Sequence, residues 1–160
     1  MLDKKKLIEE NKKCVFEIFV LGFLPCDDYY CMDDEGNKNE NTVVAVHSDE
    51  FKSFSELERF TRSVYCQAEA DRLLYGEGGK ALYCDKDGAL CTDVALHGGR
   101  GYYVDWDNYA INDLAQGAEA CDFEVVTTEE NVFNGSVKEI RLPFKAILEN
   151  GEWKLAKLVY

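Results

Sequence analysis

The chain has 160 residues, of which 46% are hydrophobic and 12% aromatic, so it is long and apolar enough to fold as one domain over residues 1–160. This composition excludes an intrinsically disordered chain, which buries too little apolar surface to fold. The formal net charge is −13, the wrong sign for neutralising nucleic-acid phosphates or binding an anionic membrane surface. The favoured partners are therefore cationic: a basic protein surface, or a metal ion held by carboxylates.

The negative charge is concentrated in residues 26–50, which we call the acidic segment. It holds one lysine and eight acidic residues, giving −7 of the total −13. Exposed like charges at this density favour rapid encounter with a basic partner, because long-range attraction steers the approach. The alternative is that the acids serve solubility alone. The candidate partner-binding residues are Asp27, Asp28, Asp33, Asp34 and Glu35.

Apolar residues at helical spacing predict a first helix over residues 4–21, with Asp3 as its N-cap and Gly22 and Pro25 at its end. A basic start followed by an apolar run is also typical of a signal peptide. Glu17 lies inside that run and no small-residue cleavage site follows it, so we expect a folded helix instead. The run is also too short to span a bilayer.

The middle of the chain predicts short helices and strands. Ser53 and Glu56 have the spacing of a capping box, and apolar residues continue at helical spacing to about residue 65. A glycine, Gly76, is expected to close the next helix. The further elements expected are a strand at 42–47, a helix at 68–75, hairpin strands at 80–84 and 89–94, and a strand at 102–106.

The last forty residues carry the strongest strand signals. Asn-Gly pairs at 134–135 and 150–151 separate three alternating runs, at 123–133, 136–148 and 152–160. Asn-Gly between alternating runs is the strongest short-range hairpin signal, so these runs predict a three-stranded antiparallel meander. Helices first and long strands last predict an α+β fold, in which N-terminal helices pack on a curved antiparallel sheet.

The seven cysteines cannot all pair within one chain, and they show no Cys-x-x-Cys spacing. We therefore expect free thiols in a reducing compartment, which favours the cytoplasm. A tight turn at 85–88 places Cys84 opposite Ala89 or Leu90 rather than Cys91. That register argues against a disulfide across this hairpin.

The sequence offers little for catalysis, and we expect a protein that is not an enzyme. It has no Gly-x-Ser-x-Gly motif and no phosphate loop, and its imidazole bases are His47 and His97. Asp105 and Asp107 lie two apart on the predicted strand 102–106, where a solvated face is favoured over acid–base work. No cofactor and no metal are expected, because the acids and cysteines lack the spacing of calcium or zinc sites.

Arg100 stands among Gly98, Gly99 and Gly101 and is a possible anion site, formed by its guanidinium and exposed backbone amides. The following residues indicate a strand, so no helix N-terminus adds to such a site. The alternative, which we favour, is a turn that uses the conformational freedom of glycine.

Several stretches recur in the order seen in a known family. They are the apolar helix leading to Leu24-Pro25, the strand before Phe51, the run FKSFSELERFTRSVY at 51–65, the Leu73-Leu74 pair, the Gly98-Gly-Arg-Gly loop and the ending ENGEWKL at 149–155. Together they cover most of the chain, which resembles the bacterial DL-endopeptidase inhibitor (IseA-like) family.

The resemblance implies a non-enzymatic α+β protein with a cystatin-like sheet that blocks secreted cysteine endopeptidases cutting peptidoglycan stem peptides. It also implies a location outside the cytoplasm, whereas the thiols and the missing signal favour the cytoplasm. We therefore expect an acidic binding protein that inhibits or regulates a cell-wall endopeptidase. The alternative is a cytoplasmic ligand-binding or sensor domain whose sheet and helices enclose a cystatin-like pocket.

Overall fold

The computed structural model describes residues 1–29, 35–37, 41–99 and 101–160. The short 3-10 turns η2 (Glu77–Gly79) and η3 (Val94–Leu96) lie among the longer elements. In chain order, those elements are α1 (Lys4–Lys13), the π-helical η1 (Cys14–Phe19), β1 (Val43–Ala45), α2 (Phe54–Val64), α3 (Gln67–Tyr75), β2 (Tyr83–Lys86), β3 (Ala89–Asp93), β4 (Tyr102–Val104), β5 (Ala110–Gln116), β6 (Ala120–Asn131), β7 (Val137–Glu149) and β8 (Glu152–Leu155).

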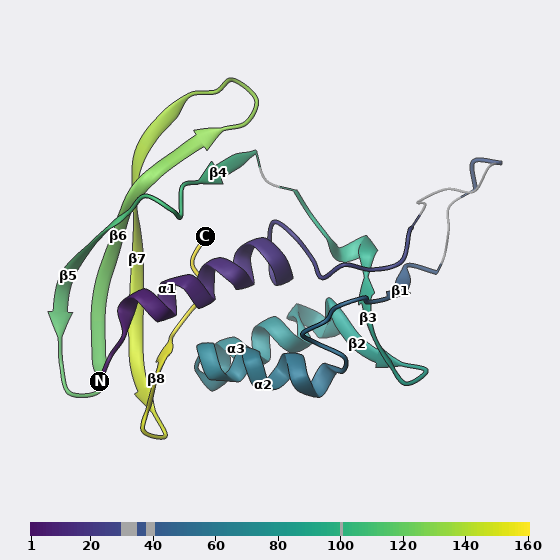
Figure 1. Cartoon of the computed structure of the whole chain (residues 1–160), viewed down its shortest axis with the longest axis horizontal. Coiled ribbons are helices and arrows are strands. Elements are labelled where there is room, and N and C mark those ends of the chain that lie inside the picture. The colour runs from purple at the N-terminus through teal and green to yellow at the C-terminus, as the bar shows by residue number, and fades with distance from the viewer. Residues whose placement is uncertain (30–34, 38–40, 100) are drawn as a thin grey trace.

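The larger sheet is antiparallel, has five strands and curls around α1 (Figure 1). Its order is β4-β6-β7-β8, and β5 pairs with β6 as well. Figure 1 shows β5, β6 and β7 as long curved ribbons, with α1 crossing their concave side. The predicted α+β fold, with helices packed on a curved antiparallel sheet that ends in the meander β6-β7-β8, is confirmed.

The smaller sheet has the order β1-β3-β2 and is also antiparallel. Helix α2 contacts α1, β2 and β8, so it connects the two sheets. The buried apolar residues form one cluster that draws on all three α-helices and both sheets. The acidic segment includes β1, and its described residues 35–37 lie away from this common core (Figure 1).

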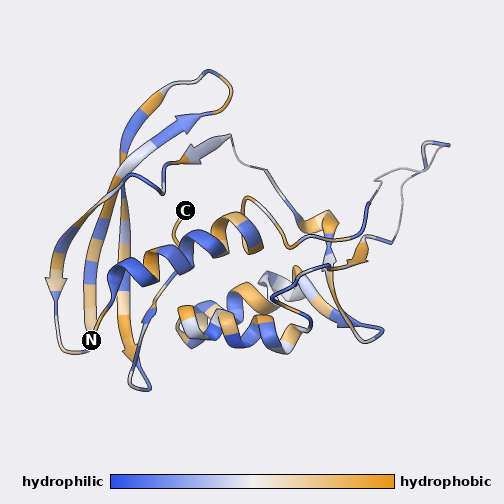
Figure 2. Cartoon of the chain, in the orientation of Figure 1, coloured by the Kyte–Doolittle hydropathy of each residue, from blue (hydrophilic) through white to orange (hydrophobic). Residues whose placement is uncertain are grey.

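Alternating burial along β6 places its apolar side chains against α1. Every second residue between 121 and 127 is buried, and Figure 2 shows the matching change of hydropathy along β6 and β7. The ring of Phe123 stacks on Phe144 with centroids 5.2 Å apart, and Trp106 meets Phe144 edge-on at 6.3 Å. These aromatic contacts form the centre of the curled sheet.

The C-terminal tail is held by two buried polar side chains. Asn11 of α1 donates a hydrogen bond from Nδ2 to the Val159 carbonyl (2.7 Å) and accepts bonds at Oδ1 from the Val159 amide and the Tyr65 hydroxyl (3.0 Å each). Glu69 of α3 accepts a bond from the Leu158 amide (2.8 Å). The tail therefore joins α1 to α3 after the chain has left β8.

The predicted helix boundaries are largely confirmed. The Asp3 carboxylate accepts a bond from the Lys6 amide (3.0 Å), and the Ser53 hydroxyl accepts one from the Glu56 amide (3.3 Å), as N-caps do. Gly76 ends α3 with a positive φ of 69°. The first helix departs from expectation in one respect, because its last turns, η1, are π-helical.

The predicted register of the β2–β3 hairpin is wrong. The turn has two residues, Asp87 and Gly88, with φ angles of 53° and 80°, rather than the four residues expected. Positive φ at both central positions is the geometry of a type I′ hairpin turn. Because the turn is shorter, Cys84 lies directly opposite Cys91.

Three further expectations need correction. Strand β5 was not predicted, because an exposed edge strand shows no clear alternation. Asn134-Gly135 belongs to a longer loop between β6 and β7, whereas Asn150-Gly151 forms the expected two-residue turn. Strand β8 ends at residue 155, five residues before the end expected from alternation.

Asp105 and Asp107 do not share a strand face, because β4 ends at Val104. The Asp105 carboxylate accepts bonds from the amides of Asp107 (3.0 Å) and Asn108 (3.1 Å) and so forms a turn. A hydrogen bond from the Asn108 side chain (3.0 Å), together with those from the two amides, stabilises the charged form and lowers the pKa of Asp105. Asp107 pairs with Lys12 on α1. Both carboxylates therefore have structural partners rather than the arrangement of an acid–base pair.

Candidate partner-binding site

The acidic segment is a loop closed at its base. Residues 25–27 run antiparallel to residues 45–47, so the chain leaves and returns at one place on the smaller sheet. In Figure 1, residues 35–37 lie well away from the helices and sheets. The base is closed by the antiparallel bridge between Cys26 and Val46, which consists of the backbone hydrogen bonds from Asp27 to Ala45 (2.9 Å) and from His47 to Pro25 (2.6 Å).

The predicted partner-binding acids fall into two groups. Asp27, Asp28 and Glu35 are exposed. Asp27 contacts the His47 imidazole, whereas Asp28 makes no ion pair with the described part of the chain. Asp33 and Asp34, together with the possible anion-binding residue Arg100, lie outside the described residues.

The last two acids of the segment are paired with lysines. Glu50 contacts Lys13 of α1, and Asp49 lies 3.5 Å from Lys52. These pairs are exposed and stabilise the fold little, but they neutralise this end of the segment. Asp28, which has no ion pair with the described part of the chain, lies nearer its beginning.

Many cations elsewhere in the molecule already have acidic partners. Such local pairs leave few cations to offset the charge of the acidic segment. The pairs include Lys4–Asp113, Lys12–Asp107, Arg62–Asp71 (2.7 Å), Arg72–Glu69 (2.7 Å), Arg141–Glu124 (2.6 Å) and Lys138–Glu129 (3.1 Å).

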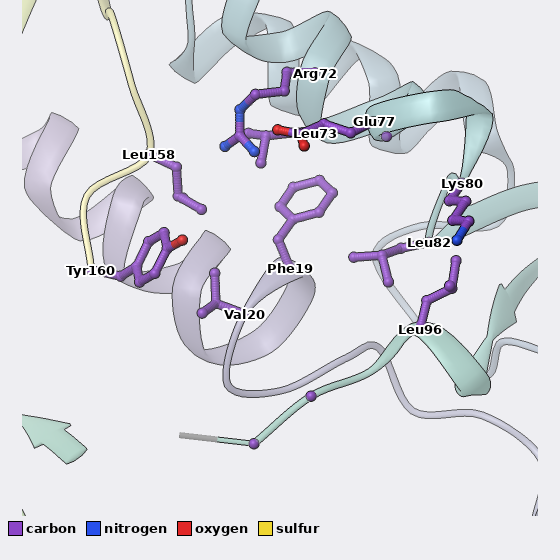
Figure 3. A pocket seen from close by; sticks show the side chains of 13 residues that line it. Phe19, Val20, Arg72, Leu73, Glu77, Lys80, Leu82, Leu96, Leu158 and Tyr160 are labelled. Atoms are coloured by element: carbon purple, nitrogen blue, oxygen red, sulfur yellow. The ribbon is translucent and has the colours of Figure 1, made fainter. Parts of the chain in front are cut away.

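A cleft of about 480 Å³ opens between η1, α3, the loop after η3 and the C-terminal tail. Figure 3 shows Phe19 pointing into its centre, between Leu73 on one side and Leu82 on the other. The wall beside the tail is completed by Leu158 and Tyr160. The floor is therefore apolar and is built from segments far apart in the sequence.

Charged groups line the rim of this cleft. The Arg72 guanidinium binds Glu69 through two hydrogen bonds (2.7 and 2.8 Å), and Glu69 is fixed in turn by the tail. Lys80, also on the rim, makes no ion pair with the described part of the chain. The backbone of Gly98 and Gly99 borders the cleft, so the glycine loop noted in the sequence lies beside it.

Both imidazoles contact other side chains. His97 Nε2 lies 2.8 Å from the Thr92 hydroxyl, and its ring packs on Phe23 at 4.0 Å. Because the Thr92 hydroxyl donates to the Leu82 carbonyl (3.0 Å), its oxygen accepts a hydrogen bond from the Nε2–H of His97. Burial lowers the pKa of His97. His47, as described above, contacts Asp27 rather than a thiol.

Three thiols have raised pKa values. Burial raises the pKa of Cys14 to about 12 and also raises those of Cys26 and Cys84. A nucleophilic cysteine needs the opposite shift, because the thiolate is the reactive form. These three cysteines are therefore poor nucleophiles at neutral pH.

Within the described ranges, no three His, Cys, Asp or Glu side chains are grouped so as to hold a metal ion. No helix in that part of the chain is both long and apolar enough to cross a membrane. Comparisons with known protein families and with curated proteins found no match to this sequence.

The cleft is the feature that sequence reasoning missed. Phe19 and Val20 belong to the apolar run of the first helix, but the opposite wall comes from α3, the residues after η3 and the chain terminus. No local pattern in the sequence signals that these segments meet. The exposed acids, by contrast, were visible as a charge cluster.

Proposed function

We propose that the chain is a non-enzymatic binding protein whose acidic segment docks on a basic protein surface. The observation that carries this proposal is the loop closed at its base, with Asp27, Asp28 and Glu35 exposed on it. A charged loop that stands away from the core reaches a partner before the rest of the molecule does. Long-range attraction then raises the rate of encounter.

The charge selects the class of partner. A chain with a net charge of −13 is repelled by nucleic acid and by anionic lipid. The same chain is attracted by a basic cleft or patch on another protein. The resemblance to IseA-like inhibitors suggests one such partner, a cysteine DL-endopeptidase that cleaves peptidoglycan. We therefore propose inhibition or regulation of such an enzyme as the role of the chain.

The described imidazoles and thiols support a non-enzymatic role. The His97 ring bonds the Thr92 hydroxyl and packs on Phe23, and the His47 ring contacts the Asp27 carboxylate. The raised pKa of Cys14 and Cys26 is unfavourable for nucleophilic catalysis. Purified protein is expected to show no peptidase, esterase or glycosidase activity. Turnover that disappears in His47→Ala or His97→Ala would overturn this part of the proposal.

The docking proposal is tested by measuring association with a purified cell-wall DL-endopeptidase. In one variant, Asp27, Asp28, Asp33, Asp34 and Glu35 become Asn or Gln. A matched control makes the same change at five acids elsewhere: Glu17, Asp87, Glu119, Glu130 and Glu139. Both variants lose the same net charge, so a difference between them reports the position of the charge.

The first variant should associate about tenfold more slowly or worse, with a smaller change in the dissociation rate, and the control should change little. Salt at about 0.15 M, which screens exposed charges beyond about 8 Å, should slow the wild type in the same way. Equal on-rates for the two variants would show that the acids serve solubility. No binding and no inhibition by the wild type would exclude this class of partner.

A second candidate function is ligand binding in the cleft. It rests on the apolar floor around Phe19 and on the position of Lys80 at the rim, which together suit a small ligand with an apolar body and an anionic group. Anilinonaphthalene sulfonate has this chemistry and serves as the probe. Its fluorescence should rise with wild type, and Leu96→Asp should abolish the rise, whereas Leu114→Asp on the exposed strand β5 should not. Equal fluorescence with all three proteins would exclude the cleft as the site.

A further inference from the structure

Cys84 and Cys91 lie directly opposite each other on the β2–β3 hairpin. Opposite residues of an antiparallel pair have Cα atoms about 4.5–5.5 Å apart, and their side chains project from the same face of the sheet. A disulfide needs Cα atoms about 4.4–6.8 Å apart. The hairpin backbone therefore brings the two thiols within bridging reach without any shift of the strands.

The other cysteines in the described part of the chain lack such a partner. Cys121 on β6 faces Ala146 on one side and Gln116 on the other. Cys26 lies opposite Val46 at the base of the acidic segment. The remaining two, Cys14 and Cys66, are on or next to helices and are buried. The hairpin pair is thus distinguished by its register.

The exposure of the pair suits stepwise oxidation. Cys84 is exposed, whereas Cys91 is 6% exposed. An oxidant in solution therefore reaches Cys84 first, and Cys91 is placed to complete the bond from inside. We propose that Cys84 and Cys91 form a redox site that closes to a reversible cross-strand disulfide when the protein meets a small disulfide oxidant such as oxidised glutathione.

The exchange takes two steps. The Cys84 thiolate attacks one sulfur of oxidised glutathione, forming a mixed disulfide and releasing one glutathione thiolate, which takes up a proton. Cys91 then loses its proton and attacks the Cys84 sulfur, releasing the second glutathione. Two protein thiols become one disulfide, and both electrons pass to glutathione, which leaves as two thiols. An excess of reduced glutathione reverses both steps.

The surroundings of Cys84 make the first step slow at neutral pH. Partial burial raises the pKa of this thiol, Cys91 and Asp85 add to the effect, and Lys86 opposes it. A smaller thiolate fraction slows the attack on the oxidant. The site therefore suits sustained exposure to an oxidising compartment better than a rapid response.

Closure of the bridge affects the strand that supports the acidic segment. Strand β3 is central in the smaller sheet, and Ala45 of β1 lies on the other side of Cys91. Strand β1 forms the base of the acidic segment through Ala45. A disulfide between Cys84 and Cys91 thus links β2 covalently to β3, the strand that pairs with β1 at this base.

The test uses the full chain incubated with oxidised or reduced glutathione at mildly alkaline pH, blocked with an alkylating agent and digested with trypsin. Cleavage after Lys80, Lys86 and Arg100 places Cys84 and Cys91 on separate peptides, residues 81–86 and 87–100. A disulfide joins them into one species that mass spectrometry identifies. Its abundance should rise at least tenfold under oxidised glutathione and fall again on reduction.

Two variants decide the assignment. Cys84→Ser, at an exposed position, should abolish the linked peptide, whereas Cys26→Ser should leave it unchanged. Circular dichroism should show both variants folded as wild type. The proposal is overturned if Cys84 accumulates as a stable glutathione adduct with Cys91 still alkylated. It is equally overturned if other cysteine pairs link as readily in the folded protein.

Discussion

The curled sheet with α1 and the smaller sheet with the acidic segment are held together by different kinds of contact. In the first region, the fully buried side chain of Asn11 makes three hydrogen bonds, and the buried rings of Phe123 and Phe144 stack on each other. In the second, the two backbone hydrogen bonds of the Cys26–Val46 bridge close a loop whose described carboxylates are exposed. Stability therefore depends most on the first region.

The largest effect is expected from truncating the aromatic centre of the first region. Phe123→Ala should lower the free energy of unfolding by about 3–5 kcal/mol, because it removes a buried ring that stacks on Phe144 and leaves a cavity. Urea unfolding followed by circular dichroism measures this change. Phe133→Ala is the matched control, since Phe133 is 86% exposed, and it should cost less than about 1 kcal/mol.

The next effect tests the attachment of the tail. Asn11→Ala should cost about 3 kcal/mol, because it leaves the backbone of Val159 and the hydroxyl of Tyr65 without partners in the interior. Asn112→Ala removes an exposed amide that bonds Glu124 and should cost well under 1 kcal/mol. Similar losses for the two variants would mean that the tail contributes little to stability.

A smaller effect is expected from His97 beside the smaller sheet. Its folded-state pKa is lowered by burial from the ordinary value of 6.5, so protonation favours the unfolded chain. The stability contribution of neutral His97 is intact above pH 6.5 and is lost as the pH falls through the folded-state pKa. The Tm of thermal unfolding should therefore fall less steeply between pH 8 and pH 5 in His97→Gln than in wild type. Parallel curves for the two proteins would contradict this prediction.

The smallest effect concerns the acidic segment itself. Changing Asp27, Asp28, Asp33, Asp34 and Glu35 to Asn or Gln should alter the free energy of unfolding by less than about 1 kcal/mol, since exposed charges contribute little to stability. The same urea titration measures it. A loss as large as that of Asn11→Ala would remove the contrast between the two regions, and would assign these acids a role in folding.

Much of the local structure was predictable because its cause lies within a few residues. Asp3, Ser53 and Gly76 act on the helix ends beside them, and Asn150-Gly151 forms the turn that its own backbone preferences favour. The acids of the acidic segment were recognisable for the same reason, since a charge cluster needs no knowledge of the fold.

The sequence by itself therefore determined the helices, the meander and the position of the charge, all of which follow from short-range patterns. Tertiary structure decided the features that depend on distant segments. It added β5 as an exposed edge and buried Asn11 where the C-terminal tail returns, whereas the Cys84–Cys91 register follows from the local two-residue turn at Asp87-Gly88. It also formed the cleft around Phe19. These outcomes depend on which surfaces pack together, and packing is a property of the whole chain that no short run of residues encodes.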